Sequence, residues 1–408
     1  MPLAPYQRVL AQRDVRRALL LGLLIRVPLF AAGVILTLHV VDDLGRSWSD
    51  AGLVAGAATV CIAISGPWRG KLLDRLGLRR VVLPSLLVAG ACWSVAPFLG
   101  YWPLLTLASI AGLFVVPTFS IIRQAVIAAV PEGDRRTALS LDSVVVEMAF
   151  IIGPVAAIWL TAVWPTAWVL FTLQMLGVAA AVVLWWANPA IVSASTLAED
   201  RIAARVPRNA WLRPRFVAVC AAAAAATVVL TGSDVSLVAA LREWDEVPRL
   251  GVVLLLWGLG SIVGGLVYGA QGRPIPPFLL LGVLSIMTIP LAVAPGVVSM
   301  AVISFVAGLV VAPTVTATVD AVTRIVPDGA RGEALGWHGS FMTAGSALGA
   351  PIGGAAIDRW GYAGGFLSVA AIGLLIAMLG AGATWWRHRG GARRTRKPAA
   401  AGTVELAA

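Results

Sequence analysis

Charged residues are scarce in this chain. Asp, Glu, Lys and Arg make up 12% of its 408 residues, against about 25% in a typical soluble protein. Apolar side chains account for 59% of the sequence. This composition excludes a soluble globular enzyme, a disordered chain and a nucleic-acid-binding domain. The formal net charge of +11 therefore needs a membrane explanation before any other.

Cysteine and lysine are also rare. The three cysteines lie inside apolar runs without metal-ligand or redox spacing, which argues against a disulfide framework or a zinc site. The sequence also has no phosphate-binding loop, nucleophile elbow or HExxH motif. We therefore expect no catalytic residue, no metal, no cofactor and no ATP drive. Only two of the 31 basic residues are lysine, and the Arg-, Ala- and Gly-rich composition is typical of a GC-rich bacterial genome.

The apolar residues are grouped in long runs. A helix that spans a bilayer needs roughly 20 of them, so the composition supplies material for about twelve spans. The runs cover residues 18–41, 51–68, 81–100, 103–130, 138–162, 166–187, 215–240, 251–270, 278–294, 298–325, 334–356 and 364–386. The sequence thus predicts an all-α membrane protein with twelve transmembrane helices.

The basic residues predict the orientation of these spans. With an even number of spans, both termini lie on one side of the membrane. That side carries 24 of the 31 Lys and Arg residues, whereas the opposite loops hold four, Arg46, Arg242, Arg249 and Arg359. Because cytoplasmic loops are enriched in Lys and Arg, both termini are predicted to be cytoplasmic. We expect a multi-pass protein of the bacterial plasma membrane, with the lipid bilayer as a partner and no nucleic acid.

An internal repeat divides the chain into two halves. The 29 residues from Ala111 and the 29 from Ala307 align without a gap and are identical at 14 positions, among them Pro131/Pro327, Gly133/Gly329 and Arg135/Arg331. Both copies run in the same direction, so they predict two pseudo-symmetric six-helix bundles, residues 1–187 and 215–386. A cytoplasmic central loop, 188–214, joins them, and a basic disordered tail, 387–408, follows. Two such halves with a site between them are an architecture of secondary transporters.

The loop between the second and third apolar runs carries a recognisable motif. It reads GKLLDRLGLRR from Gly70 to Arg80. This pattern resembles the signature loop of the major facilitator superfamily, Gly-x-x-x-Asp-Arg-x-Gly-x-Arg-Arg, and with the spans and the repeat the resemblance covers essentially the whole chain. It implies a secondary transporter that moves a small molecule by alternating access.

The resemblance also implies a conformational latch. In the family the motif aspartate helps hold the two halves together in the outward-open state, a role that falls on Asp74 with Arg75 and Arg79 as its partners. Span 11 begins on the same side, so its positive N-terminus would face Asp74. The latch residues are Gly70, Asp74, Arg75, Gly77, Arg79 and Arg80. For Arg79 and Arg80, enforcing topology is an open alternative. The second half has no acidic counterpart, so we expect a one-sided latch.

Charges inside apolar spans are costly and point to function. The resemblance implies that spans 1, 4, 7 and 10 line a central cavity. We expect Arg123 to pair with Glu147 at the same depth, because an unpaired charge there is costly. The pair is either static, or Glu147, or Asp320 near Arg324, exchanges a proton. His338 could titrate or be structural, and Asp142 is assigned to capping span 5. The cavity and proton-coupling candidates are Arg26, Arg123, Glu147, Asp234, Asp320, Arg324 and His338.

Two glycine patterns complete the candidates. Gly153 and Pro154 in span 5 partly resemble the antiporter motif of the family, although alanines replace its later glycines. Span 11 carries the fuller pattern, with Gly349, Pro351, Gly353 and Gly354. Small residues at this spacing let helices approach closely, so both packing and a role in export stay open.

The expected function is secondary active transport, most specifically proton-coupled efflux of amphipathic or drug-like compounds by a monomer. An alternative is a proton-coupled symporter that imports a small polar metabolite, which the threonines of span 10 favour. A more remote alternative is a multi-pass membrane enzyme or sensor. The 27-residue central loop offers no soluble domain for that role.

Overall fold

The structure is a computed structural model that describes residues 4–46, 48–161, 163–191, 207–271 and 273–394. These residues form helices joined by short turns. A chain that crosses lipid has to satisfy its backbone hydrogen bonds internally, and helices do so within one segment. The all-α class predicted from the apolar runs is therefore confirmed for the described part of the chain.

The N-terminal bundle follows a short leading helix, α1 (Ala4–Ala11). Its helices are α2 (Arg13–Leu38), which widens into the π-helical turn η1 (His39–Asp43), α3 (Trp48–Leu76), α4 (Leu78–Val95), the turn η2 (Ala96–Phe98), α5 (Tyr101–Leu113), α6 (Thr118–Ala128), the turn η3 (Glu132–Asp134), α7 (Arg135–Thr161) and α8 (Thr166–Ala187).

The C-terminal bundle follows the short helix α10 (Arg208–Trp211). Its elements are α11 (Pro214–Glu243), the turn η4 (Val247–Arg249), α12 (Leu250–Ala270), α13 (Pro277–Thr288), the turn η5 (Ile289–Val293), α14 (Val297–Gly308), α15 (Val311–Ile325), the turn η6 (Asp328–Ala330) and α16 (Arg331–Arg394).

The described residues contain ten helical stretches that are long and apolar enough to cross a membrane, and a shorter apolar stretch, Pro277–Val293. One of the ten, Asp328–Ala383, bends sharply inside α16 at Gly361, where φ is +68°. Glycine adopts this left-handed conformation without a steric penalty, and the bend falls between the apolar runs 334–356 and 364–386. The number of twelve spans and the side on which the termini lie stay predictions.

Two predicted boundaries shift. The central loop contains α10, and α11 begins at Pro214; residues 192–206 of this loop lie outside the described residues. The tail predicted as disordered begins as a helix, because α16 continues to Arg394. Residues 395–408 of the tail lie outside the described part of the chain.

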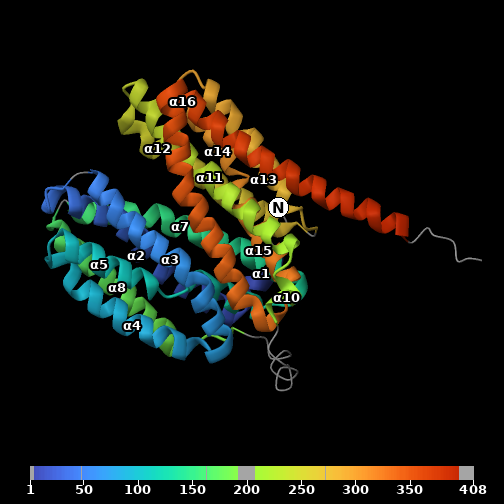
Figure 1. Ribbon diagram of the computed structural model, residues 1–408, viewed down its shortest axis with the longest axis horizontal. Helices are drawn as coiled ribbons and strands as arrows, with labels where there is room; N and C mark the ends of the chain where they lie inside the picture. The colour runs from blue at the N-terminus through green and yellow to red at the C-terminus, as the bar shows by residue number, and fades with distance from the viewer. Residues whose placement is uncertain (1–3, 47, 162, 192–206, 272, 395–408) are drawn as a thin grey trace, which may run out of the picture.

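The two bundles are separate bodies that meet along two helix pairs. Figure 1 shows the blue-to-green N-terminal bundle pointing left and the yellow-to-red C-terminal bundle pointing up. They join at the lower right, where α3 packs on α16 and α7 packs on α12. We call this junction the arginine-rich end. It is built from the loops around Gly77, Pro131, Gln271 and Pro327.

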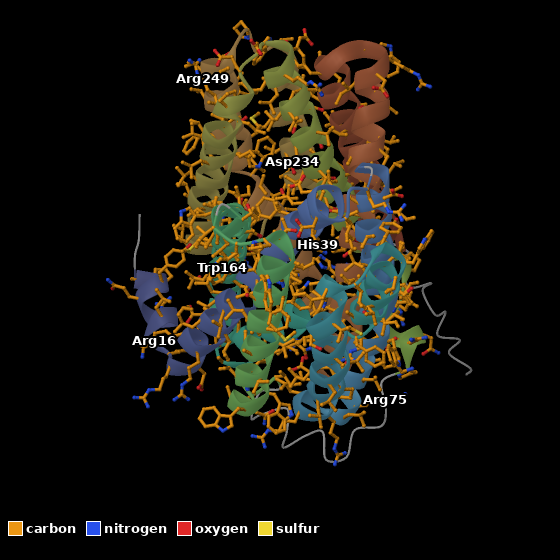
Figure 2. The ribbon with its side chains drawn as sticks, turned by 90° about the vertical axis from the view of Figure 1, so that its left-hand side faces the viewer. Arg16, His39, Arg75, Trp164, Asp234 and Arg249 are labelled. Carbon is orange, nitrogen blue, oxygen red and sulfur yellow. The ribbon has the colours of Figure 1, made fainter. Side chains whose placement is uncertain are left out.

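The apolar packing repeats this division. Val229, Leu281 and Phe366 belong to a core inside the C-terminal bundle, and Ile35, Leu104 and Leu173 belong to one inside the N-terminal bundle. A further cluster combines both bundles, with Ile127 and Leu139 packed against Trp211, Val322 and Leu335. The shared core therefore lies at the arginine-rich end. In Figure 2, Arg75 lies low in the molecule and Arg249 at its upper edge, far from that end.

Candidate functional site

The first contact between the bundles is centred on Asp74, near the end of α3. Its two carboxylate oxygens accept hydrogen bonds from the backbone N–H groups of Gly332 and Glu333, each at 2.8 Å. These N–H groups belong to the first turn of α16, where the helix itself provides no acceptor and carries partial positive charge. The predicted position of Asp74 at this helix N-terminus is confirmed. Its function as a latch stays a prediction.

Close backbone approach brings these groups together. Gly70 lies so near Gly332 that a Cβ atom at position 70 would overlap the Gly332 carbonyl oxygen. One helical turn away from this end, Gly66 lies against the backbone of Gly336. Close by, Ser340 donates a hydrogen bond to the Ala63 carbonyl at 2.5 Å. The N-terminal half of α16 therefore packs on the end of α3 through small residues, as helices in membranes commonly do.

The arginines of the motif do not pair with Asp74, contrary to the expectation for Arg75 and Arg79. Arg79 donates to the carbonyls of Trp185 and Trp186 at the end of α8, both at 3.4 Å, and its guanidinium lies over the Trp185 ring. Arg75 and Arg80 are exposed. The cause is the turn at Gly77, where φ is +75°: residues beyond it follow α4 toward α8. Gly77 and Arg79 thus position α4, and for Arg80 the topology alternative stays open.

A second junction joins α7 to α12. Arg136, in the first turn of α7, donates to the Gln271 carbonyl at 2.9 Å, and Thr137 donates to the Gly269 carbonyl at 2.6 Å. These acceptors lie where α12 ends. The arrangement corresponds to the α16–α3 junction in the other half of the molecule, with side-chain donors in place of a carboxylate acceptor. The expectation of a one-sided latch, which rests on the missing acidic residue in the second half, stays a prediction.

The leading helix α1 crosses this second junction. The Tyr6 hydroxyl donates to the Leu266 carbonyl of α12. Val9 is fully buried, and Arg8 forms an ion pair with Asp134 at 3.3 Å. Burial raises the pKa of Tyr6 to about 12. Its hydroxyl therefore keeps its proton, and can donate to the carbonyl, throughout the physiological pH range.

A buried charge cluster lies deeper inside the N-terminal bundle. Arg26 of α2 contacts Asp142 of α7 at 2.6 Å, and both side chains are at most 1% exposed. Arg123 of α6 contacts the other oxygen of Asp142 at 3.5 Å. Both guanidinium groups lie over the ring of Phe119, at 4.9 and 5.6 Å from its centroid. One carboxylate thus serves two arginines, as buried charges require.

This cluster corrects two predictions. Arg123 pairs with Asp142 and not with Glu147. Five residues along an α-helix correspond to a rotation of about 140°, so Asp142 faces α2 and α6 whereas Glu147 faces α12. Asp142 also does not cap its helix, because α7 begins at Arg135, two turns earlier.

Two other carboxylates face the interface between the bundles and have no basic partner among the described residues. Glu147 of α7 accepts a hydrogen bond from Ser261 of α12 at 3.3 Å and lies beside Gly258. Asp234 of α11 forms no hydrogen bond or ion pair with any described residue. Figure 2 looks onto the end of the N-terminal bundle and shows Asp234 on α11, above His39. Both side chains are partly exposed, and they come from opposite bundles.

The remaining candidates on α15 and α16 are engaged. Arg324 contacts Asp320 at 3.1 Å, as predicted, and Arg136 approaches the same carboxylate at 4.0 Å from the other bundle. His338 is fully buried and shares a hydrogen bond of 3.0 Å with Thr318. Asp320 therefore belongs to the closed arginine-rich end, and the contact of His338 favours its structural interpretation.

The glycine patterns pack helices within each bundle. A Cβ atom at Gly153 would lie 2.7 Å from the Val27 carbonyl oxygen of α2, and one at Gly349 would lie 2.7 Å from that of Val228 on α11. Gly353 lies against Gly232, whereas Gly354 faces open space. Pro154 and Pro351 lie inside α7 and α16. Close packing is therefore supported for Gly153, Gly349 and Gly353.

Sequence reasoning missed two buried arginines. Arg69 is 2% exposed and donates to the Val81 carbonyl at 2.6 Å and to the Ser85 hydroxyl, which ties α3 to α4. Arg136 is 8% exposed and bridges the bundles. Neither arginine is among the candidates, because each sits just outside an apolar run, beside a polar loop. The repeat offered a signal for Arg136, since it aligns with Gly332 beside Asp74.

Two helical bundles that meet at one end, with carboxylates on the faces between them, form an architecture found in secondary transporters. The family model of the Major Facilitator Superfamily matches residues 18–299 and 247–407, and the chain belongs to this family. It is a membrane-embedded transporter of small molecules and not an enzyme.

Solved structures of this family share the fold. The human organic anion transporter MFSD10 (TETRAN) superposes with a TM-score of 0.64 at 17% identity, over 90% of this chain and 99% of that one. The E. coli fucose:proton symporter FucP gives 0.62 at 14% identity, over 90% and 99%. FucP in the outward conformation gives 0.63 at 15% identity, over 88% and 98%.

One curated relative matches part of the chain. The fatty acid resistance protein FarB of Neisseria gonorrhoeae is 24% identical over 149 residues, which is 36% of this chain and 29% of FarB. The chain therefore spans under a third of that relative's length.

Proposed function

We propose that this protein is a proton-coupled exporter of amphipathic or drug-like compounds that works by alternating access in the bacterial plasma membrane. With both termini taken as cytoplasmic, the arginine-rich end is the cytoplasmic end, and the structure corresponds to an outward-facing state. The bundles would close at the opposite end when the contacts of Asp74 and Arg136 break.

One observation carries the proton coupling. Glu147 lies at mid-helix on the face of α7 that meets the other bundle, and a serine hydroxyl is its partner there. A carboxylate without a cation is costly in an apolar environment, whereas its neutral form is far less so. Asp142 and Asp320 each form an ion pair with an arginine. Glu147 is therefore the proton carrier, in preference to Asp320.

The contact with Ser261 links protonation to the movement of the bundles. Ser261 belongs to α12, in the opposite bundle, so its hydrogen bond to Glu147 depends on how α7 and α12 lie against each other. A serine hydroxyl can donate to a carboxylate or accept from a carboxyl group, so this contact is compatible with both protonation states of Glu147. Export driven by protons requires Glu147 to take up a proton in this outward-facing state and to release it to the cytoplasm after the bundles have moved and the contact has broken, so that the cycle exchanges protons for substrate. Asp234, on the facing wall, is the second carboxyl exposed to the same change.

The hydrogen bonds of the threonines in span 10, which is α15 in the structure, favour amphipathic substrates over polar metabolites. Its threonines would line a polar cavity in an importer. Instead Thr316 shares a hydrogen bond with Ser143 at 2.8 Å, Thr318 binds His338, and Thr314 donates to its own helix. The name of the relative FarB, a fatty acid resistance protein, also supports export of an amphipathic compound.

Transport into proteoliposomes tests this proposal, because the direction of the pH gradient that drives accumulation distinguishes an antiporter from a symporter. Ethidium, radiolabelled decanoate and fucose serve as probes, with the lumen set either acidic or alkaline. A proton antiporter accumulates ethidium or decanoate when the lumen is acidic, whereas a symporter accumulates its substrate when the lumen is alkaline. Accumulation of fucose in alkaline vesicles, with neither amphipathic probe moved, would establish the importer alternative.

The Glu147→Gln variant tests the assigned residue. It should abolish gradient-driven accumulation and keep exchange of the same probe across the membrane without a gradient. Glu246→Gln is the matched control, because Glu246 pairs with Arg249 in a loop at the opposite end. Unchanged proton coupling in Glu147→Gln would remove this carboxyl from the mechanism.

A further inference from the structure

Two adjoining clefts lie at the arginine-rich end, between the two copies of the internal repeat. Their volumes are about 190 and about 350 Å³, and both are lined by Glu132, Arg135 and Arg331. Gln124 and Asp328 complete the first, and Arg324 the second. Each cleft thus takes residues from both bundles, and neither includes Glu147 or Asp234.

The repeat explains why arginines meet here. In each copy a proline, Pro131 or Pro327, opens a short turn, and an arginine then occupies the first position of a long helix. Arg135 begins α7 and Arg331 begins α16. Because the pseudo-twofold axis relates the two copies, closure of this end brings both arginines and both helix N-termini to one place. Helix N-termini add positive potential to that of the arginines.

The two arginines shared by these clefts have N–H groups without an acceptor in the described part of the chain. The Nε atoms of Arg135 and Arg331 are both buried and have no hydrogen-bond partner among the described residues. Arg331 contacts Asp328 at 2.6 Å and donates to the Thr323 carbonyl through Nη2. Arg135 contacts Glu132 at 3.6 Å, but Glu132 is 85% exposed, and such surface pairs contribute little. A buried N–H without an acceptor is destabilising, so the cleft is suited to an added acceptor.

We propose that these clefts form a binding site for an oxyanion that carries a phosphate group, assembled only when the bundles are closed at the arginine-rich end. A tetrahedral phosphate offers several acceptor oxygens, which match the N–H groups of two arginines. The anion binds between Arg135 and Arg331 and joins the two bundles. It therefore favours the state closed at this end and acts separately from the transported solute.

The size of the effect follows from linkage. A ligand that binds one state alone raises the ratio of that state to the other by a factor of 1 + [L]/Kd. Inorganic phosphate at ten times its Kd should therefore raise the ratio of closed to open molecules about elevenfold. Removal of one arginine should weaken phosphate binding by about tenfold to a hundredfold, which corresponds to the loss of one charge-assisted hydrogen bond.

The test uses the full-length protein with two sources of phosphate. Inorganic phosphate is titrated calorimetrically into detergent-solubilised protein, and nanodiscs of phosphatidylglycerol are compared with nanodiscs of phosphatidylcholine. Spin labels at the exposed positions 80 and 273 report the separation of the bundles at this end by double electron–electron resonance. Variants are Arg135→Gln, Arg135→Lys, and the control Arg242→Gln, an exposed arginine at the opposite end.

The expected result is phosphate binding that Arg135→Gln weakens, that Arg242→Gln leaves unchanged, and that shifts the label distances toward the closed state. A shift produced by phosphatidylglycerol alone, with the same dependence on Arg135, supports the site and identifies a lipid headgroup as the source. Equal binding in wild type and Arg135→Gln would overturn the proposal, as would the absence of binding from both sources. Arg135→Lys keeps the positive charge. If it binds phosphate while Arg135→Gln does not, the loss comes from the missing charge and not from a folding defect.

Discussion

Replacing Asp74 with asparagine should shift the protein away from the state closed at the arginine-rich end. Asp74 accepts two backbone N–H bonds at 2.8 Å from the first turn of α16. Asparagine keeps one acceptor oxygen and loses the negative charge. Because its amide nitrogen cannot accept the second N–H, at least one charge-assisted bond is lost, worth about 1.5–3 kcal/mol. The bond exists only in the closed state, so the closed-to-open ratio should fall by about tenfold to a hundredfold.

The assay for Asp74→Asn is the distance between spin labels at positions 80 and 273, measured after Cys61, Cys92 and Cys220 are replaced by serine. The variant should show a larger fraction of long distances, with reduced transport and normal membrane insertion. Asp14→Asn is the control, because Asp14 is an exposed aspartate in the first turn of α2. An unchanged distance distribution in correctly inserted Asp74→Asn would refute the assignment of Asp74 as a latch.

Three further predictions concern packing and buried contacts. Asp142→Asn removes the only anion contacting two buried arginines among the described residues and should destabilise the protein by about 3–5 kcal/mol; a wild-type Tm would contradict this. Tyr6→Phe deletes a hydrogen bond between bundles and should lower the closed-to-open ratio by roughly twofold to tenfold, whereas Tyr101→Phe, whose bond lies within one bundle, should leave the label distances unchanged. Gly153→Ala forces backbone apart and should cost about 1–3 kcal/mol, while Gly354→Ala faces open space and should unfold at the wild-type temperature.

The fold could be predicted from the sequence because its determinants are periodic and additive. Apolar runs, arginine counts and a gap-free repeat each sum weak signals over many residues, and the bend at Gly361 falls between two such runs. The position of Asp74 also followed from the sequence, since a motif identified the residue and the predicted topology placed the start of span 11 on the same side.

The partners of buried charges could not be predicted in the same way. Depth along the helix suggested Arg123 with Glu147, but the pairing depends on helix phase, and Asp142 lies about 140° around α7 from Glu147. The contact of Arg136 could not be predicted either, because its acceptor in the other bundle, the Gln271 carbonyl, is a backbone atom. Contacts with backbone carry no signature in the sequence of the accepting residue.

The rocking of the two bundles is tested most directly by measuring both ends in parallel. Labels at positions 80 and 273 report the arginine-rich end, and labels at 42 and 249, also exposed, report the opposite end. In nanodiscs, Asp74→Asn should lengthen the first distance and shorten the second, and Glu147→Gln should abolish the pH dependence of both. Two distances that change independently, or an opposite end that keeps one separation under every condition, would contradict alternating access by these bundles.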